Sequence, residues 1–581
     1  MKRFAMIFAV LALALMFVAA CNRGGNNDVA RGDVPTPPTG EPNQWGWIVP
    51  EETLVIDLYT GWGDHATYLE DDRGGRAFLS AWLLEEMNVV INRRTYTVDV
   101  TERLNMMLAA GDYPAVITNV PDAMANIFQS QDRAVNLEPF MEDFGYNITR
   151  RVGEYLDLLR HENGGLYKLP VNWGDNPNVA GWDFGIRYDL WRELDLPMFT
   201  TPEEYFYALL AVLEANPTNE FGERTFAVST LGADATNQGL GLLTPMLAAY
   251  GFTGDRYLHN ADGTFSHWLR TEEGRDVARL MNRMWRYGMV HPDYLSTTYD
   301  DYIAHLSNGR ILGNLGTWWH AWVGGHEIWA VENPDWDNTQ RFMNASVAWP
   351  SISMEETRLL TTNFIGAHRA VITDRADNVS EIMRFINWQS SELGNMINGW
   401  GPPTENNAWN IIDGQWILRD ELMNIAQKNL YFHDMRARHG ALLYNISAAG
   451  GWLRTDGRSN FDMLDPRVTR VSMWDYWPIN PDDGSFADEG INIAWGNYTA
   501  QSFDATLYVV TFDPEEQVTW TRQTIIDNEP TWWALIMTAS TEEEAMRHFD
   551  QAAAEAEALG IAELELFYQE SFAANRALLG Q

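Results

Sequence analysis

The first part of the chain alternates between two patterns of hydrophobic residues. Runs rich in β-branched and aromatic residues predict short buried strands, which we expect at residues 53–59, 95–100 and 114–119. Between them, apolar residues recur at helical spacing and predict one face of a helix, formed by Leu79, Trp82, Leu83 and Met87. A second helix is expected over residues 103–110, ended by Gly111. Strands and helices that alternate in this way predict an α/β fold with a largely parallel sheet.

Helices dominate beyond residue 180, and two of them have clear start signals. Thr201 can cap a helix, Pro202 suits its first turn, and Glu204 completes a capping box. Thr541, which precedes three glutamates, repeats this pattern, and Gly560 is placed to end the second helix.

The N-terminus has the pattern of an export signal. Basic residues precede an apolar run at residues 4–17, which is too short for a typical membrane span, and small residues then lead to Cys21. A cysteine at this position resembles the lipobox of bacterial lipoproteins, which implies cleavage after Ala20 and a diacylglycerol on the Cys21 sulfur. We expect residues 1–20 to be a lipoprotein signal peptide and residues 21–50 a flexible tether. The alternative is an ordinary secretory signal with a cysteine there by chance.

Composition narrows the classes of partner. The 581 residues include 40 Lys and Arg against 80 Asp and Glu, a formal net charge of −40, so nucleic acid and anionic membrane surfaces are not expected partners. Hydrophobic residues make up 46% of the chain, which is enough for two large lobes. With a single cysteine, the chain can form no intrachain disulfide. The 26 tryptophans are a high number, and exposed tryptophans can stack on sugar rings.

Six segments occur in an order that resembles a known family. Gly111-Asp112-Tyr113-Pro114, within the first segment, is similar to a signature of bacterial extracellular solute-binding proteins of family 1, although Ala115 replaces the usual aspartate. The six segments are residues 107–116, 135–140, 164–170, 186–204, 280–292 and 545–574. The last of them is similar to the C-terminal part of the LplA-like branch, the large substrate-binding lipoproteins of ABC transporters. The resemblance covers nearly all of the chain beyond residue 50.

The resemblance implies a type II periplasmic-binding-protein-like fold, in which two α/β lobes joined at a hinge close on a ligand. It places residues 51–170 and 310–365 in lobe 1, and residues 171–309 and 366–581 in a helix-rich lobe 2. The chain would cross between the lobes near residues 169–170, 309–310 and 366. The family captures carbohydrate, usually oligosaccharide, outside the cytoplasm and delivers it to an ABC permease. It implies no catalytic residue and no cofactor, and we expect a monomer.

Ligands in open α/β sheets bind beyond the carboxyl ends of the strands, so the loops after the expected strands are candidate ligand contacts. Tryptophans there offer stacking faces, and Asp and Asn side chains accept hydrogen bonds from sugar hydroxyls. The candidate ligand-binding residues are Trp62, Asp64, Asn119, Trp173, Asp175, Trp318, Trp319 and Trp400. The alternative for each tryptophan is a place in the core. Asp64 could instead be a turn residue, and Asn119 could be a helix cap.

Two other functions stay open on the sequence alone. A secreted glycan hydrolase with the same tether needs two carboxylates across a site, and no motif singles out such a pair among the 80 acidic residues. A ligand sensor for a membrane kinase would share every sequence feature of a transport protein. A metal site is not expected: His320 and His326 belong to no HExxH motif, and Asp482-Asp483-Gly484 with Asp488 does not fit a calcium-binding loop.

Overall fold

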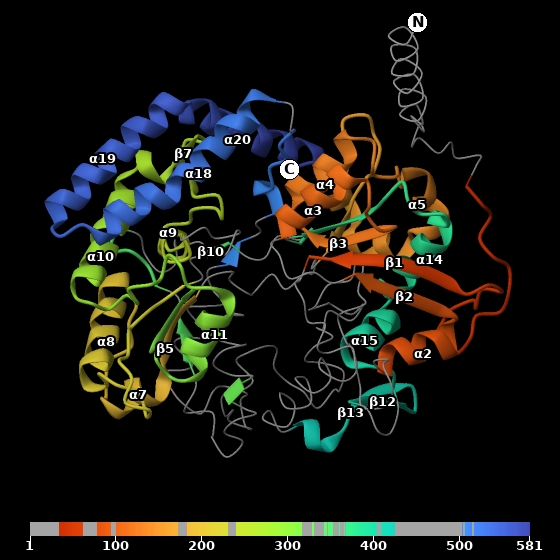
Figure 1. Ribbon diagram of the computed structural model, residues 1–581, viewed down its shortest axis with the longest axis horizontal. Coiled ribbons are helices and arrows are strands. Elements are labelled where there is room, and N and C mark those ends of the chain that lie inside the picture. The colour runs from red at the N-terminus through yellow and green to blue at the C-terminus, as the bar shows by residue number, and fades with distance from the viewer. Residues whose placement is uncertain are drawn as a thin grey trace, which may run out of the picture.

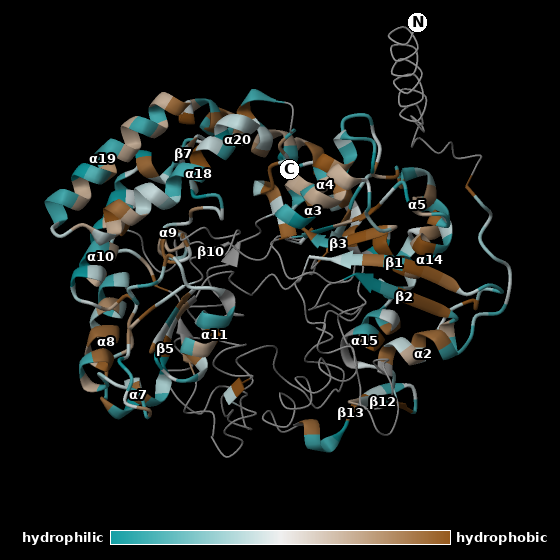
Figure 2. Cartoon of the chain, in the orientation of Figure 1, coloured by the Kyte–Doolittle hydropathy of each residue, from teal (hydrophilic) through white to brown (hydrophobic). Residues whose placement is uncertain are grey.

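The computed structural model shows two lobes that lie side by side, with strands near the centre of each (Figure 1). It describes residues 34–61, 78–94, 100–171, 183–230, 240–316, 328–329, 342–345, 347–351, 359–360, 365–366, 368–403, 408–423, 502–503, 506–513 and 516–581. Figure 2 shows hydrophobic residues concentrated on the central strands and hydrophilic stretches along outer helices.

Lobe 1 is built on a five-stranded sheet in the order β2-β1-β3-β11-β4. The strands are β1 (Leu54–Thr60), β2 (Val89–Arg94), β3 (Val116–Val120), β4 (Leu169–Val171) and β11 (His368–Ile372). β1 runs parallel to β2 and β3, whereas β11 is antiparallel to β3 and β4. Side chains alternate across β1, so Ile56 and Leu58 belong to one apolar core and Tyr59 belongs to another. Both faces of the sheet are therefore covered, as in other α/β folds.

Helices surround this sheet. They are α2 (Phe78–Met87), α3 (Val100–Ala110), α4 (Asp122–Ser130), α5 (Glu138–Phe144), α6 (Tyr146–Val152), α14 (Val379–Gln389) and α15 (Glu392–Trp400), followed by a hairpin of β12 (Trp409–Ile412) and β13 (Gln415–Leu418); short 3-10 helices are η3 (Gly153–Leu159) and η7 (Asp420–Met423). The predicted helix face is confirmed, because Leu79, Trp82, Leu83 and Met87 are all buried. Of the strand expected at residues 95–100, residues 95–99 lie outside the described residues, and Val100 begins α3. The preceding strand β2, at Val89–Arg94, was not expected.

Lobe 2 contains a three-stranded antiparallel sheet in the order β8-β5-β9. Its strands are β5 (Asp183–Arg187), β8 (Gly313–Gly316) and β9 (Phe342–Ala345). The helices are α7 (Tyr188–Glu193), α8 (Pro202–Ala215), α9 (Leu243–Ala248), α10 (Glu272–Arg286), α11 (Tyr299–Ser307), α18 (Gln517–Thr538), α19 (Glu542–Leu559) and α20 (Ile561–Leu578), with a hairpin of β6 (Tyr257–His259) and β7 (Phe265–His267) and the 3-10 helix η4 (Trp268–Arg270).

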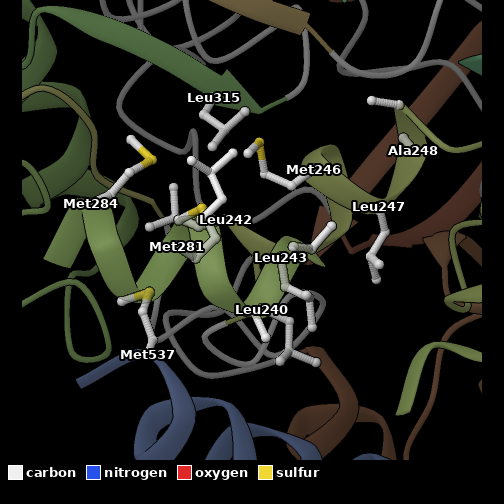
Figure 3. Close-up of a cluster of buried hydrophobic side chains, with 14 of the residues drawn as sticks. Leu240, Leu242, Leu243, Met246, Leu247, Ala248, Met281, Met284, Leu315 and Met537 are labelled. Atoms are coloured by element: carbon white, nitrogen blue, oxygen red, sulfur yellow. The ribbon is translucent and has the colours of Figure 1, made fainter. Parts of the chain in front are cut away.

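The core of lobe 2 gathers Leu and Met side chains from segments that are far apart in the sequence. Figure 3 shows Leu240, Leu242 and side chains of α9 together with Met281 and Met284 of α10, Leu315 of β8 and Met537 of α18. None of these named side chains is more than 3% exposed. Full burial of one such side chain stabilises a fold by roughly 1.5–3 kcal/mol. This packing joins α18, the first of the three C-terminal helices, to the body of the lobe.

The predicted helix starts are confirmed. The Thr201 hydroxyl accepts a hydrogen bond from the Glu204 N–H at 3.2 Å, and the Glu204 carboxylate accepts one from the Thr201 N–H at 3.1 Å, which completes the capping box of α8. Thr541 caps α19 by accepting from the Glu544 N–H at 3.1 Å. Gly560 ends that helix in the left-handed region, at φ +98°.

The pairing of the strands assigns some segments of the chain to a different lobe from the one that the sequence predicted. β8, at residues 313–316, pairs with β5 of lobe 2, and the described residues from 311 to 349 pack in lobe 2 and not in lobe 1. β11 pairs with β3 and β4, and α14 and α15 pack in the core of lobe 1. The described residues between 368 and 423 therefore belong to lobe 1. There is consequently no crossing near residues 309–310. The described residues place the crossings between β4 and β5, between β9 and β11, and between η7 and α18.

Part of the segment expected to be a flexible tether packs on lobe 1. Trp47 is only 2% exposed, and its Nε1 donates a hydrogen bond to the Met87 carbonyl at 2.8 Å. The guanidinium of Arg384 lies 3.8 Å from the centroid of the Trp47 ring. The Nε1 of Trp388 donates to the Trp45 carbonyl at 2.8 Å. The tether prediction is therefore wrong for residues 43–50, which we name the tryptophan latch, because the buried Trp47 ring and the partly buried Trp45 ring outweigh the polar, Pro-rich composition around them.

Candidate functional site

The carboxyl ends of three strands of lobe 1 meet at one edge of its sheet. β1 ends at Thr60, β3 ends beside Asn119, and β4 ends at Val171. Because β11 is antiparallel to its neighbours, its first residue, His368, lies opposite Val171 at the same edge. Figure 1 shows β1 with its carboxyl end directed toward lobe 2.

The matching edge of the lobe 2 sheet is defined by β5 and its two partners. Asp183, the first residue of β5, pairs with Gly316 at the end of β8, and Ala345 at the end of β9 pairs with Phe184. A single connection, residues 172–182, joins Val171 to Asp183. The two edges are therefore adjacent along the chain, and we call them the interlobe edges.

Asn119 is held at the lobe 1 edge in an uncommon conformation. Its φ is +57°, in the left-handed region, and its Nδ2 donates to the Thr60 Oγ1 at 3.0 Å. A side chain on Gly61 would lie 2.2 Å from the Asn119 carbonyl oxygen, so only glycine lets these two strand ends meet. Asn119 is 3% exposed, and its Oδ1 accepts no hydrogen bond from any residue that the structure describes.

The alternative role of Asn119 as a helix cap does not hold. α4 begins at Asp122 with Pro121 in the capping position, and no side chain caps its first turn. A buried amide oxygen without a donor costs roughly 1–3 kcal/mol, so an unsatisfied group at this edge needs an explanation. A hydroxyl group of a ligand would supply the missing donor.

Two hydroxyls of lobe 2 share this property. Residues 226–228 run parallel to the chain that enters β8, with Phe226 opposite Ile311. This register places Ser229 and Thr230 level with the last residues of β8, next to the lobe 2 edge. Both are at most 1% exposed, and neither hydroxyl has a hydrogen-bond partner within the described part of the chain.

Sequence reasoning missed Ser229 and Thr230, although a signal was present. They follow the apolar run at residues 226–228, as a strand followed by small polar residues, and Gly241 comes shortly afterwards. A side chain on Gly241 would lie 1.9 Å from the Thr230 Oγ1, so the loop returns directly against this hydroxyl. The carboxyl-end rule, applied to this strand, would have found them.

Four polar side chains near these edges, those of Asn119, Ser229, Thr230 and His368, are uncharged at neutral pH. Burial, and to a lesser degree the neighbouring Arg369, lower the pKa of His368 to about 4, so its imidazole is uncharged at neutral pH. Asn119, Ser229 and Thr230 carry no charge. Groups of this kind form hydrogen bonds with neutral polar ligands such as sugars.

Most of the predicted ligand-binding residues lie outside the described residues: Trp62, Asp64, Trp173, Asp175, Trp318 and Trp319, as does Cys21. Their described neighbours Gly61, Val171 and Gly316 are at the interlobe edges. Trp400 is the last residue of α15, which belongs to lobe 1, and its side chain is not described. The preceding Asn398 is a core residue, since its Nδ2 donates to the Gly394 carbonyl at 2.6 Å.

The residues weighed as metal ligands in the sequence, His320, His326 and Asp482 to Asp488, lie outside the described residues. The residues that are described bring no three His, Cys, Asp or Glu side chains together in a way that could hold a metal ion. None of the described helices combines the length and the hydropathy required to cross a membrane.

Sequence comparison finds one curated relative. The chain is 21% identical over 348 residues to the fructooligosaccharide ABC transporter substrate-binding protein FusA of Streptococcus pneumoniae. The match covers 57% of this chain and 61% of FusA, so the chain spans about three fifths of the length of this relative. A scan against models of known protein families finds no match.

Comparison with solved structures identifies the fold. The S. pneumoniae FusA complex with kestose has a TM-score of 0.63 and 16% identity, covering 90% of this chain and 99% of that one. The alginate-binding protein AlgQ2 without calcium ion has a TM-score of 0.60 and 15% identity, covering 91% and 99%. A human-milk-oligosaccharide (HMO) binding solute-binding protein from Bifidobacterium longum infantis has a TM-score of 0.58 and 15% identity, covering 90% and 99%.

These similarities confirm two predictions. The chain has the two-lobe, type II solute-binding fold, and the resemblance to extracellular solute-binding proteins that its motifs indicated is supported independently. The similar proteins named here are binding proteins and not enzymes.

Proposed function

We propose that the protein is a lipid-anchored, extracytoplasmic solute-binding protein that captures an oligosaccharide between its lobes and delivers it to an ABC permease. The observation that carries this proposal is the pair of interlobe edges, each with a buried, neutral hydrogen-bonding side chain that has no partner among the described residues. The similarity to FusA, whose structure holds kestose, favours a carbohydrate as the ligand. The cysteine at position 21 supports attachment to a membrane.

In this proposal the two lobes contribute different contacts. Asn119 of lobe 1 accepts a hydrogen bond from a sugar hydroxyl, while Ser229 and Thr230 of lobe 2 donate to or accept from another. The predicted residues Trp62, Asp64, Trp173, Asp175, Trp318, Trp319 and Trp400 add stacking faces and further acceptors around them. A ligand that contacts both lobes stabilises the closed arrangement, which the permease then recognises.

A thermal-shift screen of the full chain carrying Cys21→Ser tests the proposal. The panel consists of kestose, alginate oligosaccharides and human milk oligosaccharides, with short peptides as the comparison class. A sugar present at a hundred times its Kd should add about 2.7 kcal/mol to the free energy of unfolding. Recovery of the sugar unchanged would support binding. A cleaved sugar would instead favour a hydrolase, and a response to peptides alone would refute the carbohydrate assignment.

Tryptophan substitutions then locate the site. Trp318→Ala should weaken binding of the sugar while the melting temperature of the free protein stays unchanged. Trp520→Ala is the matched control, because Trp520 is 64% exposed on α18. Equal affinity of wild type and Trp318→Ala would remove Trp318 from the site.

A further inference from the structure

The described residues show three connections between the two lobes, and the described parts of these connections come together at one place in lobe 1. The first follows β4, and the second leads into β11. The third includes the 3-10 helix η9 (Thr506–Tyr508) and residues 509–513, whose side chains divide between the lobes: Leu507 and Val509 pack on the core of lobe 1, and Phe512 packs on the core of lobe 2. The second and third connections also pair directly, as β10 (Leu359–Leu360) runs parallel to β14 (Ser502–Phe503).

An ion cluster of two buried cations and one partly buried carboxylate lies where these connections meet lobe 1. Asp122, at the start of α4, accepts hydrogen bonds from the Lys168 Nζ at 2.9 and 3.0 Å and from the Arg369 Nε at 2.6 Å. Lys168 is 7% exposed and Arg369 is 2% exposed. Removing one member of such a cluster would leave buried charge unpaired, so the cluster forms a rigid unit in the folded lobe.

The two cations of the cluster lie next to different connections. Lys168 immediately precedes β4, from which the first connection leaves. Arg369 Nη1 donates to the carbonyls of Ile365 at 3.1 Å and Gly366 at 2.9 Å, both in the second connection.

Asn126, one turn after Asp122 in α4, reaches the third connection. Its Oδ1 accepts from the Lys168 Nζ at 2.8 Å, and its Nδ2 donates to the Phe512 carbonyl at 3.3 Å. Asn126 is 8% exposed. The bond to Phe512 is longer than those within the cluster and joins uncharged groups, so it is the weakest of these links.

We propose that Asp122, Asn126, Lys168 and Arg369 form a hinge node that holds the lobe 1 ends of all three connections together and limits how far the lobes part. The four side chains act as positioning residues: they fix the pivot and do not contact the ligand. Only the consequence for ligand affinity rests on the proposed function, since the node acts on the lobes whether or not a ligand is bound.

The decisive measurement is the distance between the lobes in the absence of ligand. In the full chain carrying Cys21→Ser, spin labels are placed at Asp143→Cys in α5 and Glu214→Cys in α8, both of which are exposed positions. Asn126→Ala should broaden or shift the distribution of distances between the labels, because the third connection is no longer held to the node. Asn126→Asp removes the same donor but keeps an acceptor for Lys168, and it decides the question if Asn126→Ala does not fold.

Asn147→Ala is the matched control. Asn147 also donates a side-chain hydrogen bond to a backbone carbonyl, that of Asn387 at 3.0 Å, but both residues lie within lobe 1. An unchanged distance distribution in the Asn126 variants would overturn the hinge node, and so would an equal change in Asn147→Ala.

If wild type binds a sugar of the panel, the Kd for that sugar should change by about 2- to 10-fold in Asn126→Ala, the range for one hydrogen bond. A wild-type protein that binds no sugar would refute the proposed function, while the distances would still decide the hinge node.

Discussion

At the scale of single residues, buried polar atoms fall into two groups, those with a partner and those without one. Ser390 and Ser229 are both fully buried, but the Ser390 Oγ donates to the Ile386 carbonyl at 2.8 Å whereas the Ser229 Oγ has no partner among the described residues. A satisfied hydroxyl stabilises the fold, and an unsatisfied one costs free energy. The same chemical group therefore has opposite effects at the two positions.

The two serines should therefore respond differently when each is replaced by alanine. Ser390→Ala should lower the free energy of unfolding by about 1 kcal/mol, because it removes a made hydrogen bond. Ser229→Ala should leave that free energy unchanged or raise it, and should weaken sugar binding by about 2- to 10-fold. Urea denaturation and a sugar titration of both variants check this. A loss of stability in Ser229→Ala with full sugar affinity would show that Ser229 is only a structural residue.

A histidine pair in lobe 2 makes stability depend on pH. His291 and His305 stack with ring centroids 4.5 Å apart, and Phe226 packs edge-on against His291 at 4.6 Å. Burial, with smaller contributions from His305 and Arg310, lowers the pKa of His291 to about 4. In the unfolded chain its pKa is about 6.5, so between these values only the unfolded chain binds the proton.

The contribution of His291 to the free energy of unfolding should therefore stay constant above about pH 6.5. Below that pH, the free energy of unfolding should fall as the pH drops toward 4. The loss approaches 1.4 kcal/mol per pH unit, or about 3 kcal/mol in total. Urea denaturation at pH 7.5 and pH 5 measures it. His291→Phe keeps a ring in the stack and removes the titrating group, so the stability of this variant should depend less on pH than that of the wild type. If the pH dependence of stability is the same in both, it comes from groups other than His291.

At the scale of helices and strands, local patterns predicted what local interactions determine. β1, β3 and α3 formed where the hydrophobic spacing placed them, and Thr201 and Thr541 cap the helices they were expected to cap. Pairing between distant strands was not predicted, because nothing in the short sequences of β8 or β11 encodes which strand lies beside them. This is why the boundaries of the lobes were wrong even though the fold class was right.

The candidate site follows the same division. The location of Asn119 at the lobe 1 edge could be predicted, because it lies near the end of a strand that the local pattern reveals. Ser229 and Thr230 were missed because residues 226–228 form an extended segment held by only two bridges, which lacks the length of a typical strand.

The tryptophan latch is an element that composition concealed, and a single substitution tests it. Trp47→Ala should lower the free energy of unfolding of lobe 1 by about 3–5 kcal/mol, because it removes a buried ring together with its hydrogen bond to Met87. Val49→Ala is the control within the same segment, since Val49 is 46% exposed, and it should change stability little. Equal stability of the two variants would mean that residues 43–50 do not belong to the folded body.

At the scale of the whole molecule, the C-terminal helix joins the lobes. Ile561, Leu564 and Tyr568 of α20 belong to the core of lobe 2, whereas Leu579 just beyond it belongs to the core of lobe 1. Asn575 Nδ2 donates to the carbonyls of Leu507 at 3.0 Å and Val509 at 2.7 Å, in the third connection. α20 is therefore a brace across the hinge (Figure 1).

Substitution of two neighbouring leucines tests how much α20 stabilises lobe 1. Leu579 is 8% exposed and Leu578 is 51% exposed. Leu579→Ala should lower the melting temperature of lobe 1 through a loss of about 2–3 kcal/mol, while Leu578→Ala should leave it within experimental error. Scanning calorimetry of both variants makes the comparison. Equal melting temperatures would show that α20 belongs to lobe 2 alone.

The tryptophan latch also determines how the molecule would be held at a membrane. If Cys21 carries a lipid, residues 22–42 separate the lipidated cysteine from the latch, and Val34 among them already packs against the core of lobe 1. The latch transfers any pull on this chain to α2 and α14 of lobe 1 and keeps it away from the three connections. Lobe 1 would then be the lobe held at the membrane, and lobe 2 would move relative to it only as far as the hinge node and α20 allow.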